Sequence, residues 1–338
     1  MDREEFGDGT ATNATPISQH FAAGRATALL GVCPTALADE PPETRTIRFA
    51  RNASICVFPQ YYLQETLRGE GFSEIGYVEA SAVRTLEPLA RGAADFSINF
   101  CLGTILEIDA GSPITILGGV HVGCYELFAR ESIRSVPELK GKSVGLETAS
   151  PALLKLMAAN VGLDPENDFQ WVTDRKLKPL ELFATGKIDA FLGFPPAPQE
   201  LHARRVGHVI LSTTVDRPWS DYYCCMLAGN ADFVRTHPVA AKRVLRAVLK
   251  ITDLCATNPA EAARHLVEGG FTPRYDYAFQ TLQQNPYDKW REYDPADTIR
   301  FYALRLREAA MIKSNPQKIL AENTDWRFFN ELKRELKA

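Results

Sequence analysis

Residues 89–100, LARGAADFSINF, recur in altered form at residues 183–194, FATGKIDAFLGF. Both stretches place an alanine, a glycine and an aspartate at matching positions, before a short apolar run that closes on phenylalanine. The aspartates, Asp95 and Asp189, stand 94 positions apart. Self-similarity over such a distance indicates one supersecondary unit used twice. We interpret both aspartates as structural residues that end the turn after the glycine.

A second match precedes each copy. A predicted strand leads through a short loop to a proline, Pro59 or Pro151, which we expect in the first turn of a helix. Each helix pattern ends in a glycine, Gly71 or Gly162, followed by a large apolar residue and another predicted strand. One β–loop–α–β–α–β unit therefore occurs twice. This organisation is typical of two α/β lobes with a ligand site between them.

The composition is that of a globular protein with room for more than one core. The chain has 338 residues, of which 45% are hydrophobic and 24% are charged. Chains of this length commonly divide into two lobes. The net charge of −4 and the pI near 5.9 give no reason to expect nucleic acid as a partner. No run approaches the roughly 20 apolar residues that span a bilayer.

The N-terminal segment, residues 1–45, lacks the periodic patterns of the remaining chain. Arg25 precedes an apolar stretch at 26–37, and ALA at 36–38 matches the cleavage pattern of a secretory signal. Pro34 interrupts the stretch, and the leading acidic residues carry the wrong sign for a signal. We expect a signal-like segment and export, with a disordered tail as the alternative.

The chain is predicted to cross twice between the two units, on strand-like runs near Leu127 and Cys225. The second unit is then an insertion, and the helical C-terminal tail returns to the first unit. We therefore expect one lobe from residues 46–127 with 226–338, and a second lobe from residues 128–225.

The two crossings are expected to act as a hinge. Gly123 and Gly229 lie at their ends, where glycine most easily adopts unusual backbone dihedrals. A ligand that bridges both lobes should then stabilise a closed form.

Five stretches of the chain carry a family resemblance. They are SICVFPQY (54–61), LKGKSV (139–144), GKIDAFL (186–192), VDRPWS (215–220) and WREYDP (290–295). Together they resemble the periplasmic solute-binding proteins of ABC importers, of the nitrate, sulfonate and taurine type. The resemblance covers nearly all of the chain after the N-terminal segment. It implies an α/β, periplasmic-binding-protein-like fold with two lobes joined by two hinge strands.

The resemblance also implies a binding function. A protein of this type captures a small anion, here of the sulfonate or carboxylate class, and delivers it to an ABC permease at the membrane. It is expected to be periplasmic, monomeric and free of a cofactor, with no nucleic-acid partner. Motifs of the G-x-S-x-G, H-E-x-x-H, P-loop and G-x-G-x-x-G types are absent from the sequence, which favours binding without catalysis.

Enzymes with the same fold supply the alternative. The pyrimidine-precursor synthase of thiamin biosynthesis is similar, but its cysteine-dense signature is absent here. An aromatic sulfinate desulfinase is also similar, and it has a nucleophilic cysteine in the first strand–helix loop. Cys56 loosely matches that position, and His121 is the candidate base. Because a fold does not decide function, a Cys56-dependent enzyme remains the rival hypothesis.

Candidate ligand-binding residues follow from the two helix-opening loops, where free backbone N–H groups favour an anionic oxygen. As an alternative, the hydroxyls of the second loop serve only as helix caps. The loop residues are Ser54, Ile55, Cys56, Thr148, Ala149 and Ser150.

Further candidates lie at the ends of the last strand of each unit and beside the crossings. Strand ends of this kind bind ligands in open α/β sheets, although the aromatic residues are equally compatible with a plain core position. These candidates are Asn99, Phe100, Cys101, Phe194, His121, Trp219 and Tyr222.

Four cysteines, Cys56, Cys101, Cys124 and Cys224, lie near predicted strand ends. A soft-metal site, a reactive thiol and small buried thiols that fill tight spaces are the three alternatives. We favour buried thiols and expect no metal. No C-x-x-C occurs, which argues against a structural zinc site.

Overall fold

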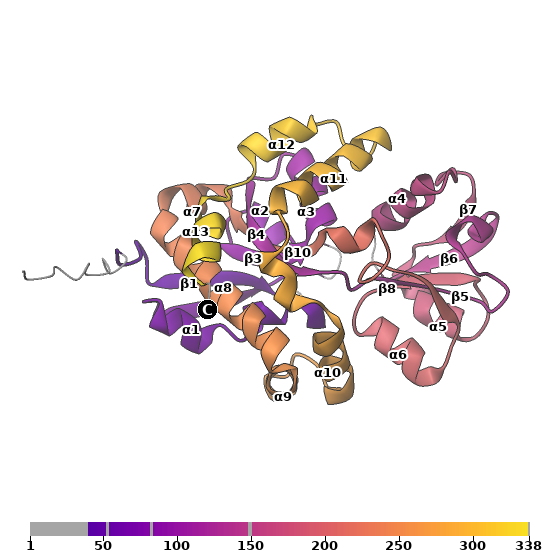
Figure 1. Cartoon of the computed structure of the whole chain (residues 1–338), viewed down its shortest axis with the longest axis horizontal. Helices are drawn as coiled ribbons and strands as arrows, with labels where there is room; N and C mark the ends of the chain where they lie inside the picture. Colours follow the sequence, from indigo (N-terminus) through magenta and orange to yellow (C-terminus); the bar gives the residue numbers. More distant parts are fainter. Residues whose placement is uncertain (1–39, 52–53, 82–83, 148–150, 337–338) are drawn as a thin grey trace, which may run out of the picture. The chain divides into compact units, whose positions relative to one another are not determined.

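Two mixed β-sheets with flanking helices make up the described part of the protein (Figure 1). The computed structural model describes residues 40–51, 54–81, 84–147 and 151–336. The signal-like pattern at 36–38 lies outside these residues. Among the residues described, no helix is both long enough and apolar enough to pass through a bilayer.

Sheet A has the strand order β2-β1-β3-β10-β4. Strand β1 is parallel to β2 and β3, whereas β10 is antiparallel to both of its neighbours. The carboxyl ends of β1, β3 and β4 therefore lie at one edge of the sheet, beside the start of β10. The strands are β1 (Thr46–Arg51), β2 (Glu74–Glu79), β3 (Phe96–Phe100), β4 (Ile114–Val122) and β10 (Tyr223–Asn230).

Sheet B repeats this plan with the order β7-β6-β8-β5-β9. Strand β6 is parallel to β7 and β8, and β5 is antiparallel to β8 and β9. Each position in sheet B thus has a counterpart in sheet A. The strands are β5 (Glu126–Ala129), β6 (Lys142–Leu146), β7 (Phe169–Val172), β8 (Ala190–Gly193) and β9 (His208–Ser212).

The helices cover both sheets. The α-helices in the described residues are α1 (Gln64–Gly69), α2 (Glu87–Ala90), α3 (Cys101–Asp109), α4 (Ala152–Asn160), α5 (Pro179–Ala184), α6 (Ala197–Arg204), α7 (Ala231–Thr236), α8 (Pro238–Thr257), α9 (Pro259–Glu268), α10 (Tyr275–Gln284), α11 (Pro295–Glu308), α12 (Pro316–Glu322) and α13 (Arg327–Glu335). The short 3-10 helices are η1 (Ile55–Tyr61), η2 (Val136–Leu139), η3 (Arg175–Leu177), η4 (Trp219–Asp221) and η5 (Tyr287–Arg291).

The predicted repeat is present in atomic detail. In sheet A, the backbone N–H of Arg48 donates to the Asp95 carboxylate at 2.8 Å, and the Asp95 N–H donates to the Arg48 carbonyl at 2.8 Å. In sheet B, Ser143 and Asp189 make the same two contacts at 2.8 and 3.0 Å. Both aspartates therefore tie the first strand of a unit to the third, and their predicted structural role is confirmed.

The C-terminal helices pack on sheet A (Figure 1). Helix α8 buries one apolar face that includes Val244, Leu245 and Val248. Gly118 in β4 permits this packing, because a Cβ atom there would lie 2.5 Å from the Phe329 ring and 3.2 Å from Leu245. Helices α8 and α13 therefore lie directly against β4.

Two segments carry the chain between the sheets. Residues 123–125 connect β4 to β5, and residues 213–222 connect β9 to β10. Each then enters the other sheet as its antiparallel strand. The segments also bond to each other: the N–H of Cys124 donates to Thr214 Oγ1 at 3.2 Å, and that of Tyr125 donates to Thr213 Oγ1 at 3.0 Å.

Two local predictions were wrong. Pro59 is not in the first turn of an α-helix but inside η1, and α1 begins only at Gln64. The Gln60 side chain stabilises this tight segment by donating to the Ala50 carbonyl and accepting from the Ile98 N–H. Gly229 is not at a hinge; it lies within β10, where a Cβ would stand 2.5 Å from Val234.

Candidate functional site

The carboxyl edge of sheet A gathers most of the predicted site residues. η1 follows β1, α3 follows β3 without a break, and His121 is the penultimate residue of β4. Open α/β sheets bind ligands at this edge. The start of β10 adds Cys224 and Cys225, so residues far apart in the sequence meet at one place.

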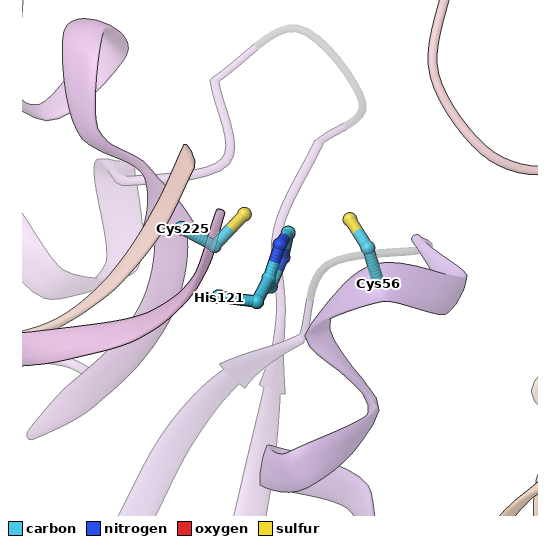
Figure 2. Close-up of side chains that lie close together, drawn as sticks. All are labelled: Cys56, His121 and Cys225. Carbon is cyan, nitrogen blue, oxygen red and sulfur yellow. The ribbon is translucent and has the colours of Figure 1, made fainter. Parts of the chain in front are cut away.

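Four cysteines and one histidine form a sulfur–imidazole cluster, defined by Cys56, His121, Cys124, Cys224 and Cys225. The Cys124 and Cys224 sulfurs lie 3.2 Å apart, those of Cys56 and Cys124 3.9 Å, and those of Cys224 and Cys225 4.0 Å. Every member is at most 5% exposed. Figure 2 shows the His121 imidazole between the sulfurs of Cys225 and Cys56. Three of the four cysteines predicted at strand ends therefore converge.

The hydrogen bonds of His121 orient its ring. Nδ1 lies 3.2 Å from the carbonyl oxygen of Val122, which can only accept, so Nδ1 carries the proton. Nε2 is then a lone-pair acceptor, and it is buried without a hydrogen-bond partner. In neutral histidine the bond made by one nitrogen fixes the role of the other. The cluster therefore contains an unused nitrogen lone pair beside its sulfurs.

Cys56 is the thiol that ionises most readily. Hydrogen bonds from the Cys124 thiol and then the Cys225 thiol hold the pKa of Cys56 well below its ordinary value; His121 contributes less, and burial opposes the shift. The Ser54 hydroxyl lies 3.1 Å from the Cys56 sulfur. Burial raises the pKa of Cys124 and of Cys224 well above the usual thiol range. The cluster thus favours one thiolate among several thiols.

Sequence reasoning missed Cys225. Successive side chains of a regular strand point to opposite faces, so Cys224 and Cys225 are not expected to meet. β10, however, has register shifts against β4 on both sides of Cys225, and such bulges redirect side chains. The only sequence signal was the adjacency of two cysteines.

Cys124 has an unusual backbone conformation. Its φ is 114°, in the region that non-glycine residues rarely adopt. Such strain persists where the surroundings fix the residue, and it gathers at functional sites. Here the hydrogen bond to Thr214 fixes Cys124 and directs its sulfur into the cluster.

An aromatic row links the two carboxyl edges. The ring centroid of Tyr125 lies 4.9 Å from that of Phe100 and 5.5 Å from that of Phe194. Phe100 also contacts Tyr302 at 6.2 Å. The structure therefore connects the two predicted phenylalanines through Tyr125, a residue of the first crossing that the sequence did not single out.

Trp219 and Tyr222 both contact the ring of Phe301. Tyr222 stacks on Phe301 with centroids 3.8 Å apart, and Trp219 contacts the same ring at 5.8 Å. Trp219 is only 2% exposed, so it supports the neighbouring rings instead of offering a free surface.

The remaining predicted residues have separate environments. Asn99 bonds to Thr85 and accepts from the Phe100 N–H. Ile55 and Cys101 are buried, and burial raises the pKa of the Cys101 thiol. The other three predicted residues lie outside the described part of the chain: Thr148, Ala149 and Ser150.

Several solved structures have a similar fold. The periplasmic nitrate-binding protein NrtA from Synechocystis PCC 6803 is 16% identical, with 88% of this chain and 90% of that chain covered and a TM-score of 0.73. The MOPS-bound alkanesulfonate-binding protein SsuA from Xanthomonas axonopodis pv. citri is 15% identical, with 84% and 99% covered and a TM-score of 0.64. The desulfurization enzyme DSZB is 14% identical, with 86% and 99% covered and a TM-score of 0.58.

These likenesses confirm the predicted periplasmic-binding-protein fold. No curated protein matches the sequence. A family model described as NMT1/THI5 like matches residues 74–262, more than half of the chain. The chain therefore belongs to the NMT1/THI5-like family.

Proposed function

We propose that the protein captures a small organic anion, of the sulfonate or carboxylate class, and delivers it to an ABC permease. The observation that carries the proposal is the N-terminus of α3 beside the aromatic row. α3 begins at the carboxyl edge directly after Phe100, and no side chain caps its first turn. Free N–H groups there suit an anionic head group, and Phe100 and Tyr125 suit an apolar or aromatic body.

The similar structures support this function. One is a periplasmic nitrate-binding protein, and another is an alkanesulfonate-binding protein. By analogy we place this protein in the periplasm as a monomer, with the permease as its membrane partner.

Thermal unfolding in the presence of candidate ligands tests the proposal. Aryl and alkyl sulfonates, the matching carboxylates and nitrate are compared with uncharged amides of the same shape. A ligand of the native state stabilises it by about 2.7 kcal/mol at 100 times its Kd. Stabilisation by the uncharged amides equal to that by the anions would overturn the proposal.

Calorimetric titration of variants then locates the ligand. Phe194→Ala should weaken binding of the best anion, because Phe194 belongs to the aromatic row. Phe328→Ala is the matched control, since Phe328 is a partly buried phenylalanine of α13. Equal weakening by both substitutions would mean that the aromatic row does not contact the ligand.

The rival function, a Cys56-dependent enzyme, has one specific observation in its favour. The sulfur of Cys56 and a ring nitrogen of His121 lie within 4.8 Å of each other, and the pKa of Cys56 is lowered mainly by the Cys124 thiol. Such a pair can form an activated nucleophile. Cys56 is, however, only 3% exposed. Turnover of an aromatic sulfinate that is lost in Cys56→Ser and kept in Cys101→Ser would replace the binding proposal.

A further inference from the structure

The sulfur–imidazole cluster has the donor atoms of a soft-metal site. Two triads, Cys56–His121–Cys225 and His121–Cys124–Cys224, each bring their ligand atoms within 4.8 Å of one another. Thiolate and imidazole ligands select thiophilic ions over Mg²⁺ or Ca²⁺. With Zn–S bonds of about 2.3 Å, two sulfurs on a tetrahedral zinc are about 3.8 Å apart. The Cys124 sulfur lies 3.9 Å from that of Cys56, which is the spacing of an additional sulfur ligand beside the first triad.

His121 provides an independent observation. Its Nδ1–H donates to the backbone carbonyl of Val122, and its Nε2 is buried and unpartnered. Metal-binding histidines commonly show this arrangement, in which an outer hydrogen bond orients the ring and leaves the other nitrogen for the metal. A buried acceptor without a partner is otherwise destabilising.

We propose that the cluster binds one thiophilic metal ion, of the Zn²⁺ or Cu⁺ class, through Cys56, His121 and Cys225. These three ligands lie around one point, with the imidazole between the two sulfurs (Figure 2). Cys124 offers a further sulfur donor, 3.9 Å from that of Cys56.

Charge balance fits the burial of the site. Zn²⁺ with two thiolates and a neutral imidazole is a neutral complex, and a buried neutral group avoids the cost of an unpaired charge. The two cysteines bind as thiolates, so any proton that they carry passes to solvent on binding. The two triads share His121, so one ion per chain is the expected stoichiometry.

Ordinary buried thiols explain less of the structure. Small apolar thiols fill space without requiring a partner, as Cys101 and Cys255 do on other elements. They do not account for a buried histidine nitrogen without a hydrogen-bond partner beside the sulfurs, nor for the positive φ of Cys124.

The test is metal binding to the reduced, metal-stripped full chain. Co²⁺ serves as the optical probe for Zn²⁺, because tetrahedral thiolate–cobalt complexes show a charge-transfer band. Elemental analysis after loading with Zn²⁺ gives the stoichiometry, and a chromogenic Cu⁺ chelator gives the copper affinity by competition. We expect one ion per chain, no binding of Mg²⁺, and at least about tenfold weaker binding in Cys56→Ser, His121→Ala and Cys225→Ser.

Cys255→Ser is the matched control, because Cys255 is also a fully buried cysteine but lies on α8. It should bind metal as the unsubstituted chain does. Circular dichroism of the metal-free variants shows whether weaker metal binding comes from the loss of a ligand atom or from unfolding. The proposal is overturned if neither Zn²⁺ nor Cu⁺ binds stoichiometrically. It is also overturned if Cys56→Ser and Cys255→Ser, both folded, bind with equal affinity. Anion binding plays no part in these measurements, so their failure leaves the proposed function standing.

Discussion

Replacing Gly123 by alanine should destabilise the protein at the contact between the two crossings. Gly123 has a φ of +72°, and a Cβ there would lie 2.4 Å from Thr214 Oγ1 and 2.6 Å from Thr214 Cα. The left-handed conformation costs an alanine about 1–2 kcal/mol. Overpacking against a neighbour adds about 1–3 kcal/mol. The expected loss is therefore about 2–5 kcal/mol, and it cannot be relieved by a side-chain rotation because one close atom is backbone.

Gly141→Ala is the control that separates the cost of the Thr214 contact from the cost of backbone strain. Gly141 has a φ of +76°, close to that of Gly123, but no atom lies within 4 Å of its Cβ position. This variant should lose only the backbone cost of about 1–2 kcal/mol. Urea unfolding of both variants, with equal slopes, gives the difference directly. Equal losses would refute the inference that the crossings pack tightly at Thr214.

Two further outcomes follow from particular contacts. Gly119→Ala should cost about 1–3 kcal/mol by overpacking, because its Cβ would lie 2.3 Å from the buried Tyr223 ring, whereas Gly76→Ala, with open space, should not destabilise in the same urea assay. The Glu126 hydrogen bond raises the pKa of His202 in the folded protein. The pair therefore stabilises the fold fully below the pKa of histidine in the unfolded chain, about 6.5, and this stabilisation is lost as the pH rises through the raised folded pKa. Melting temperatures measured across that range should therefore fall less in His202→Gln, and an unchanged slope would contradict the assignment.

The repeated unit could be predicted from the sequence because the residues that define it make contacts within their own unit. Asp95 and Asp189 stand at equivalent turns, and each bonds to the first strand of its own unit. Gly71 and Gly162 end the preceding segments with positive φ values of 101° and 79°. Glycine is the residue that adopts this conformation without strain. Features of this kind depend on a few neighbouring residues, so a single sequence shows them.

The centre of the candidate site could not be predicted in the same way. Cys225 reaches the cluster through irregular pairing of β10, and Cys124 reaches it through a φ of 114°. Both are departures from regular geometry that tertiary contacts impose. Tyr125 was missed for a related reason: its neighbours, Phe100 and Phe194, belong to different sheets. Periodicity along one strand carries no information about such contacts.

The duplication and the crossings contribute different things to this protein. Both units have the same strand order and the same aspartate contact, so the repeat alone gives two equivalent edges. The sulfur donors at the carboxyl edge of sheet A come largely from the crossings. Cys124 lies on the segment that leaves sheet A, and Cys224 and Cys225 lie on the strand that returns to it. The cluster therefore combines residues of the first unit with residues of both crossings. Gly123→Ala overpacks the contact at Thr214, which also bonds to Cys124, so it should weaken Co²⁺ binding at the proposed site even though it removes no ligand atom.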